Sequence, residues 1–78
     1  MPRFFFDVTD SGNVSIDDLG IELPSLEAAR REALQTLGEI AKDELPDGDH
    51  RQFSIDIREG DGAAILSASL SLRVERKT

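Results

Sequence analysis

The stretch of 21 residues between Pro24 and Pro46 constrains the fold of this chain more than any other segment. Ser25 is a favourable N-cap, because its hydroxyl oxygen can accept a backbone N–H from the first turn. Pro46 lacks the N–H that would continue a helix. Apolar residues recur between them at helical spacing and form one stripe, made of Leu26, Ala29, Ala33, Leu34, Leu37, Ile40, Ala41 and Leu45. The pattern predicts one amphipathic helix over residues 25–45.

Alternating residues before this helix predict an N-terminal hairpin. Residues 3–8 alternate with a period of two and are rich in aromatic and branched side chains, which is typical of a strand. Residues 9–13 have turn chemistry, and a short second strand is expected to follow. The phase breaks near Gly20, so residues 21–23 are either a brief further strand or an extended lead-in to the helix. The residues expected to face inward are Phe4, Phe6, Val8, Val14 and Ile16.

A second hairpin is predicted after the helix. Residues 47–50 form a polar loop, residues 53–58 alternate as a half-buried strand, and residues 59–62 have the Asp-Gly chemistry of a hairpin turn. Residues 64–74 then give the cleanest period-two run in the chain. The residues expected to face inward are Phe53, Ile55, Ile57, Ala64, Leu66, Ala68, Leu70, Leu72 and Val74.

The order of elements predicts a ββαββ, two-layer α+β fold in a single small domain, residues 1–78. One long helix is expected to pack on one face of a mainly antiparallel four-stranded sheet. The strand order 2-1-3-4 is favoured, and a mixed sheet with the first and third strands parallel is the alternative. The other face is expected to meet water because most of its residues are polar: Phe5, Ser54, Asp56, Arg58, Ile65, Ser67, Ser69 and Ser71.

Composition excludes several classes of protein. The chain has no cysteine, which excludes disulfides, thiol catalysis and thiolate metal sites. A net charge of −7 argues against binding to nucleic acid or to an anionic membrane surface. The apolar run at the N-terminus is too short for a signal peptide, and no stretch is long enough to span a membrane. We expect a cytoplasmic protein.

No constellation of residues indicates catalysis. His50 is the sole histidine, and its polar surroundings predict an exposed loop residue. No nucleophile-elbow or phosphate-loop motif is present. One segment mimics the spacing of a calcium loop, but it carries hydroxyls at two ligand positions and ends in Asp, so a β-turn is favoured: Asp7, Thr9, Ser11, Gly12, Asn13, Ser15 and Asp18. We therefore predict no catalytic, cofactor-binding or metal-binding residues and no cofactor, and expect that the protein is not an enzyme.

An interaction surface is the remaining candidate site. Phe5 and Ile65 are the apolar residues expected on the polar face of the sheet, with Arg58 beside them. Either Phe5 and Ile65 form a contact patch for a second chain, or the Phe5 ring is partly shielded by Arg3, Arg58 or a chain terminus. Ordering 78 residues costs roughly 117 kcal/mol at about 1.5 kcal/mol each, and burial returns a similar amount. A partner surface would therefore stabilise the fold.

The sequence has features of two known families. The chain begins Met-Pro-Arg-Phe-Phe-Phe and continues with D-x-x-G-x-E-L before a helix rich in Ala and Arg. In these features it resembles a family of small uncharacterised bacterial proteins, frequent in alphaproteobacteria, that begin M-P-R-(F/Y)-(F/Y)-F. That resemblance covers nearly the whole chain and implies a domain of unknown function. The residues that carry it are Met1 to Phe6, Asp17 or Asp18, Gly20, Glu22, Leu23, Ala28 and Ala29.

The second resemblance covers residues 3–45. Strand, glycine turn, strand, Asp-x-x-Gly, extended piece and then Ser-Leu-Glu-Ala-Ala is similar to the HicB-type antitoxin domain, a reduced RNase-H-like fold. It implies an acidic binder that masks a basic toxin. The sequence does not identify a biological role, so three hypotheses stay open. The first is a small non-enzymatic interaction or regulatory module that forms a homodimer or binds an unknown protein, the second is the antitoxin-like binder, and the third is a metal protein or enzyme.

Overall fold

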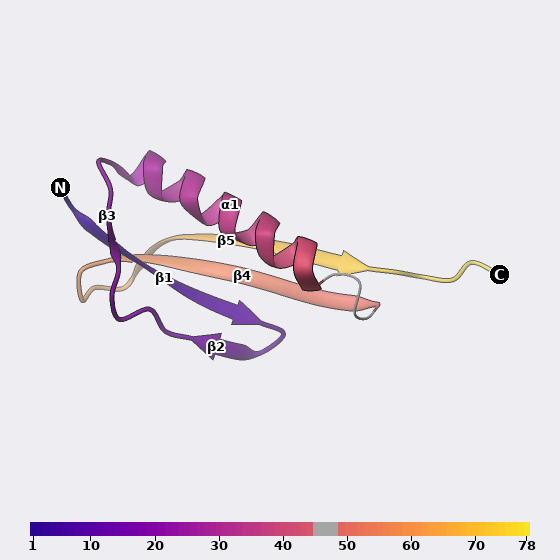
Figure 1. The fold of residues 1–78 in the computed structure, drawn as a ribbon. Helices are drawn as coiled ribbons and strands as arrows, with labels where there is room; N and C mark the ends of the chain where they lie inside the picture. Colours follow the sequence, from indigo (N-terminus) through magenta and orange to yellow (C-terminus); the bar gives the residue numbers. More distant parts are fainter. Residues whose placement is uncertain (45–48) are drawn as a thin grey trace.

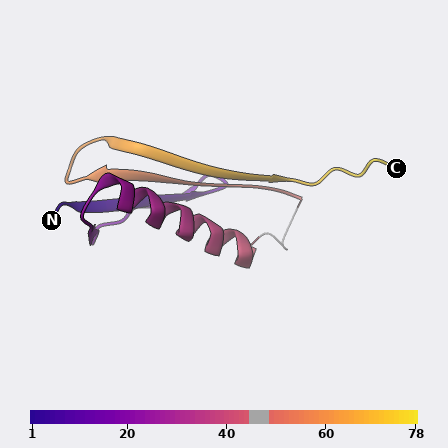
Figure 2. The same cartoon turned by 90° about the horizontal axis from the view of Figure 1, so that it is seen from above.

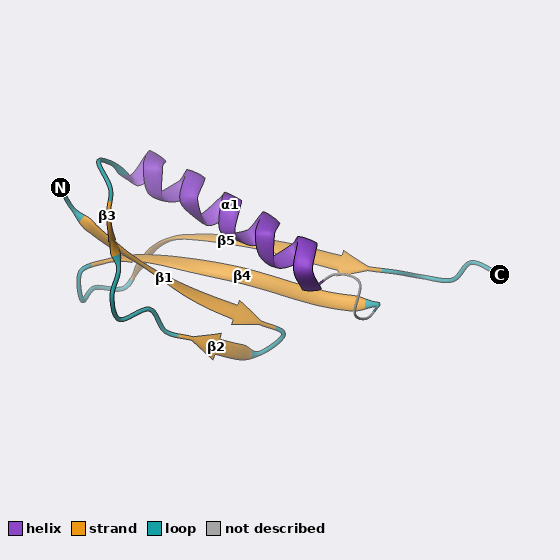
Figure 3. Ribbon diagram, viewed as in Figure 1, coloured by secondary structure: helices purple, strands orange, loops and turns teal. Residues whose placement is uncertain are grey.

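One helix lies across one face of an antiparallel sheet in the computed structural model, which describes residues 1–44 and 49–78 (Figure 1). The sheet has the order β2-β1-β4-β5, and the short β3 pairs with β1 on the same side as β2. This confirms the α+β fold and the favoured strand order, whereas the mixed-sheet alternative is wrong because β1 and β4 are antiparallel. The elements are β1 Arg3–Asp10, β2 Asn13–Ser15, β3 Ile21–Glu22, α1 Leu26–Glu44, β4 His50–Glu59 and β5 Ala64–Arg73 (Figure 3).

Helix α1 begins where its cap was expected. The Ser25 Oγ accepts the backbone N–H of Ala28 at 3.2 Å, which satisfies one of the free donors of the first turn. The predicted end at Pro46, together with Leu45 and the Asp47–Gly48 turn, lies outside the described residues. The buried face of the helix consists of Ala29, Ala33, Leu37 and Ala41. Three of these four are alanines, whose small side chains let the helix backbone approach the sheet.

The core lies between this helix face and the middle of the sheet. Its largest fully buried side chains are Phe4, Phe53, Ile55 and Ile57. Around them lie partly buried apolar residues, namely Phe6, Val8, Leu23, Ile40, Leu66 and Ala68. The central position of β1 and β4 explains why their inward residues are the best covered.

The first hairpin corrects one prediction. Ser11 and Gly12 form a two-residue turn, in which both φ angles are positive, at 48° and 97°. This shorter turn pairs Val14 with Thr9, which lies on the face away from the helix, so an inward position for Val14 is wrong. Val14 is 58% exposed and Ile16 is 65% exposed. A turn one residue longer or shorter changes which face each following side chain occupies.

The second hairpin contains a β-bulge that the alternation did not reveal. Ile57 pairs with Leu66 and Arg58 pairs with Ala64, which leaves Ile65 as the extra residue. Ala64 therefore lies on the face of Arg58, and its predicted inward position is wrong. The register beyond the bulge follows the prediction from Leu66 to Leu72.

The molecule is elongated and exposes much surface for its size. Its accessible area is 5530 Å², whereas area scaling gives about 4,700 Å² for a compact 8.6 kDa monomer. Its radius of gyration is 14.0 Å, against about 11.5 Å for a compact domain of 78 residues. Seen from above, the C-terminal residues continue past the sheet (Figure 2). No helix in the described part of the chain is long and apolar enough to cross a membrane.

Candidate functional site

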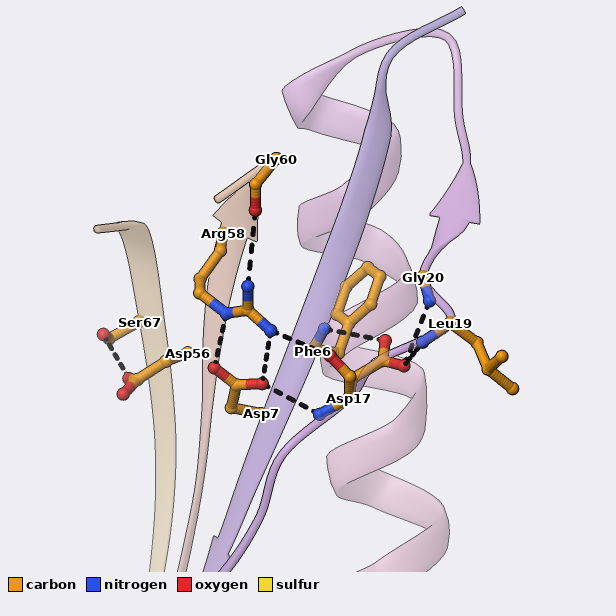
Figure 4. Close-up of polar contacts among 9 residues, drawn as sticks. All are labelled: Phe6, Asp7, Asp17, Leu19, Gly20, Asp56, Arg58, Gly60 and Ser67. Atoms are coloured by element: carbon orange, nitrogen blue, oxygen red, sulfur yellow. Dashed lines mark hydrogen bonds and ion pairs between the residues drawn. The ribbon is translucent and has the colours of Figure 1, made fainter. Parts of the chain in front are cut away.

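A break in the pairing along β1 is the feature around which the polar residues gather. On the side away from β4, β1 pairs with β3 at Arg3 and Phe4 and with β2 from Val8 onward. Between these two pairings, the carboxylate of Asp17 lies beside β1 and its Oδ2 accepts the backbone N–H of Phe6 at 3.1 Å (Figure 4). A side chain thus takes the place of a strand at this point.

The same carboxylate also shapes the loop that carries it. Its Oδ1 accepts the backbone N–H groups of Leu19 at 3.0 Å and Gly20 at 3.1 Å, which is an Asx-type turn. Gly20 has a φ of 71°, and a Cβ there would lie 2.9 Å from the Phe5 ring and 2.9 Å from Cγ of Arg3. Asp17 is therefore the aspartate of the D-x-x-G pattern whose carboxylate organises the loop. Glycine is favoured at position 20 because its φ is positive and because neighbouring side chains leave no room for a Cβ.

Arg58 fastens this loop to β4. Its Nε donates to Asp7 Oδ2 at 2.8 Å and its Nη2 to Asp7 Oδ1 at 3.1 Å, which makes a two-pronged ion pair. Nη2 also donates to the backbone oxygen of Asp17 at 2.8 Å, and Nη1 to that of Gly60 at 3.3 Å. The side chains of Arg58 and Asp7 are only 21% and 13% exposed. Four of the five guanidinium N–H groups are thus engaged.

These contacts fix the charge of both carboxylates. The hydrogen bond from Arg58 lowers the pKa of Asp7, and it outweighs the effect of burial. Burial is the largest influence on the pKa of Asp17 and raises it, but the backbone donors Gly20, Phe6 and Leu19 together lower that pKa below its ordinary value. Both groups are ionised at neutral pH and saturated with donors. The cluster can therefore hold a loop in place, but it offers neither a free general acid nor an unengaged base.

Two residues of the predicted interaction surface are in direct contact. Phe5 and Arg58 are cross-strand partners, and the guanidinium carbon lies 4.9 Å from the centre of the ring. Phe5 is half-buried, because Gly20 also packs against its ring. Ile65 lies in the bulge of β5 and is 48% exposed. Sequence reasoning missed Asp7 and Asp17, although the D-x-x-G spacing was a signal for the second.

A second ionic cluster joins three elements at the far end of the helix. Arg51 donates from Nη2 to both carboxylate oxygens of Asp10 at 3.0 Å. Its Nη1 donates to the backbone oxygen of Glu44 at 3.3 Å, and its guanidinium lies 5.1 Å from the centre of the Phe53 ring. A cation at a helix C-terminus is favourable, so Arg51 fixes the end of α1 to β1 and β4.

The remaining candidates show no reactive arrangement. His50 is exposed as predicted, but its assignment to the polar loop is wrong, because it is the first residue of β4 and pairs with Arg73. A shallow depression of about 250 Å³ lies beside the first turn, lined by Thr9, Ser11, Gly12, Gln52 and Ser54. Across residues 1–44 and 49–78, no group of three or more histidine or acidic side chains is placed to hold a metal ion.

Fold and site together define a small two-layer α+β domain whose main polar network anchors a loop to the sheet. Residues 3–71 match the family described as Domain of unknown function (DUF6894), and the chain belongs to that family. This confirms the expectation of an uncharacterised family. No curated protein and no solved structure matches the chain.

Proposed function

We propose that this protein is a small non-enzymatic module that acts through protein–protein contacts, and that its contact element is the outer edge of β5. In the described chain, β5 pairs with β4 alone, so ten residues present one unpaired side. The opposite margin differs: β2 is only three residues long, and the gap along β1 is filled by Asp17. The contrast between a closed edge and an open one supports this choice.

The direction of the backbone groups along β5 follows from two hydrogen bonds. Val74 N–H donates to the opposite residue, Asp49, at 2.7 Å, and Ser11 N–H donates to its opposite residue, Gln52, at 2.9 Å. Because such pairs alternate in antiparallel ladders, every second residue of β5 directs its N–H and C=O away from β4. Within the regular part of the strand these residues are Ser67, Ser69 and Ser71.

This edge lacks the usual protection against pairing. From Ala64 to Leu72 the strand has no charged residue and no proline, and its bulge lies at one end. The serines that point their backbone outward have small side chains, which allow another backbone to approach. An extended segment of a protein could therefore add to the sheet as a further strand.

The surface formed by Phe5, Arg58 and Ile65 would flank such a contact. Four N–H groups of Arg58 already have acceptors within the chain, so it would contribute shape and ring contact instead of new ionic bonds. Ile65, at the bulge, is the member of this surface that lies in β5 itself.

Proline at one edge position tests the proposal. Ser69→Pro removes an N–H that points away from β4, so it should leave the internal ladder intact while it blocks addition of a strand. Ser69→Thr keeps the N–H and is the matched control. In affinity capture from native cells, proteins retained by the natural chain and by Ser69→Thr should be lost with Ser69→Pro. Equal retention by all three would contradict an edge-mediated function.

An antitoxin-like role is the second candidate, and the net charge of −7 favours it. Acidic surface would attract a basic partner at long range, with strong dependence on salt. The test is binding to the product of a neighbouring gene that encodes a small basic ribonuclease. Binding that weakens as salt rises would support this role, and the absence of both such a gene and any effect on growth would refute it.

A further inference from the structure

Building on the proposed role of the β5 edge, we propose that its occupant is a second copy of this chain. The two β5 strands pair antiparallel around a two-fold axis at Ser69, so that the two sheets become one continuous sheet. An antiparallel pair of identical strands is self-complementary, and it closes with two subunits. It leaves β2, the short strand, at each outer margin.

The register follows from the ends of the regular strand. The bulge at Ile65 limits pairing on one side, and the charge of Arg73 limits it on the other. The segment between them is residues 66–72, whose centre is Ser69. With the axis there, Ser69 forms a hydrogen-bonded pair with Ser69 of the second copy, and Ser67 pairs with Ser71. This arrangement gives about six backbone hydrogen bonds, two for each pair.

Apolar contacts on the helix-bearing face favour the same register. Leu70 is 38% exposed although its side chain lies on the face that holds the core. In the proposed pair it lies opposite Ala68 of the second copy, and Leu66 lies opposite Leu72.

The chain exposes roughly 800 Å² more than area scaling gives for its mass. That excess is about the area that each partner buries in an interface of standard size.

Charge favours antiparallel over parallel pairing. Glu59 and Asp61 precede β5, whereas Arg73, Arg76 and Lys77 lie at its end or after it and outnumber Glu75, which pairs with Arg73 at 3.0 Å and with Lys77 at 3.2 Å. The turn between β4 and β5 and the C-terminal residues lie at opposite ends of the molecule (Figure 1). Antiparallel pairing therefore brings the basic end of each copy toward the acidic turn of the other, twice. This contact reconciles self-association with a net charge of −7.

Cysteine cross-linking tests the register, since the natural chain has no cysteine. Ser69→Cys should form a disulfide-linked dimer under mild oxidation, because Cα atoms of a hydrogen-bonded pair lie about 5.5 Å apart, within disulfide range. Ser67→Cys alone and Ser71→Cys alone should link poorly, because their own symmetry mates lie more than about 13 Å away. An equimolar mixture of those two variants should link efficiently. Val14→Cys, on the opposite margin, is the exposed control.

Several-fold more linked dimer for Ser69→Cys than for Val14→Cys, together with linking of the mixture but not of its components, is the expected result. Linking of Ser69→Cys at the level of Val14→Cys would overturn the proposal, and so would a mixture that links no better than its parts. Analytical ultracentrifugation distinguishes failure of the dimer proposal from failure of the proposed binding function of the β5 edge. A strictly monomeric natural chain whose captured partners are lost with Ser69→Pro would refute the dimer and leave edge binding intact.

Discussion

Removal of the Asp17 carboxylate should cost this protein much of its stability. Asp17→Ala deletes the acceptor of three backbone N–H groups, those of Phe6, Leu19 and Gly20. The Phe6 N–H is partly buried and has no strand opposite it, so its loss of an acceptor costs about 1–3 kcal/mol. The other two donors lie nearer solvent, and each adds a few tenths to about 1 kcal/mol. The sum is about 1.5–5 kcal/mol.

Two further variants test whether the Asp17 carboxylate itself is responsible for this loss of stability. Asp17→Asn keeps one carbonyl oxygen for Leu19 and Gly20 but turns an amide N–H₂ toward the Phe6 N–H, so it should lose roughly half as much stability. Asp18→Ala changes the exposed neighbour, whose side chain takes no part in the network, and should change stability by less than about 0.5 kcal/mol.

Urea unfolding followed by far-UV circular dichroism measures these differences at one protein concentration, so that any association affects all variants alike. The chain has no Trp or Tyr, which makes dichroism preferable to fluorescence. Equal midpoints for Asp17→Ala and Asp18→Ala would refute the role assigned to the Asp17 carboxylate.

Two glycines, the two low-pKa carboxylates and Arg51 give further tests of the structure. Gly38→Ala should stabilise the protein by about 0.5–1 kcal/mol, because a Cβ there meets nothing within 4 Å. Gly20→Ala should destabilise it by about 2 kcal/mol, because the φ of Gly20 is 71° and a Cβ there would clash with the Phe5 ring. Urea midpoints of the two variants that move in the same direction would contradict this prediction. The pKa values of Asp7 and Asp17 in the folded protein are lowered from 3.8, so the stability that these carboxylates contribute is complete above pH 3.8 and is lost as pH falls through their folded pKa values. The unfolding free energy measured as a function of pH should show this loss of stability. The loss should be smaller in Asp17→Asn, which has one of the two carboxylates removed. Arg51→Met should lower the urea midpoint clearly more than Arg73→Met does, because Arg51 ties a helix end to the sheet whereas Arg73 pairs with the nearby Glu75 at the end of β5. Equal midpoints for the two variants would refute that role.

The sequence predicted the elements whose signals are local. The spacing of apolar residues in α1 and the Ser25 cap located the helix, and alternation located β1, β4 and β5. Hairpin connections place β1 beside β2 and β4 beside β5, and the strand order favoured from the rules for crossover connections also places β1 beside β4, as observed.

Registers could not be predicted from the same signals. A turn of two residues instead of five reversed the face of Val14, and the bulge at Ile65 reversed that of Ala64. Alternation tells which residues share a face within one strand, but the turn geometry decides how two strands match.

The polar network escaped prediction because its members are distant in sequence. Arg58 and Asp7 are separated by 51 positions and meet only after β1 and β4 have paired. Asp17 had a local signal, the following Gly20, but its bond to Phe6 depends on where β2 ends and β3 begins.

Amide hydrogen exchange along β5 tests the central claim most directly. In a free edge the N–H groups of Ser67, Ser69 and Ser71 exchange quickly, while those of Ala68 and Leu70 are protected by β4. If the edge binds a second copy, the three serine amides become protected as protein concentration rises, and the other two stay protected throughout. Serine amides that exchange quickly at every concentration, up to millimolar protein, would contradict the pairing of two copies through the β5 edge.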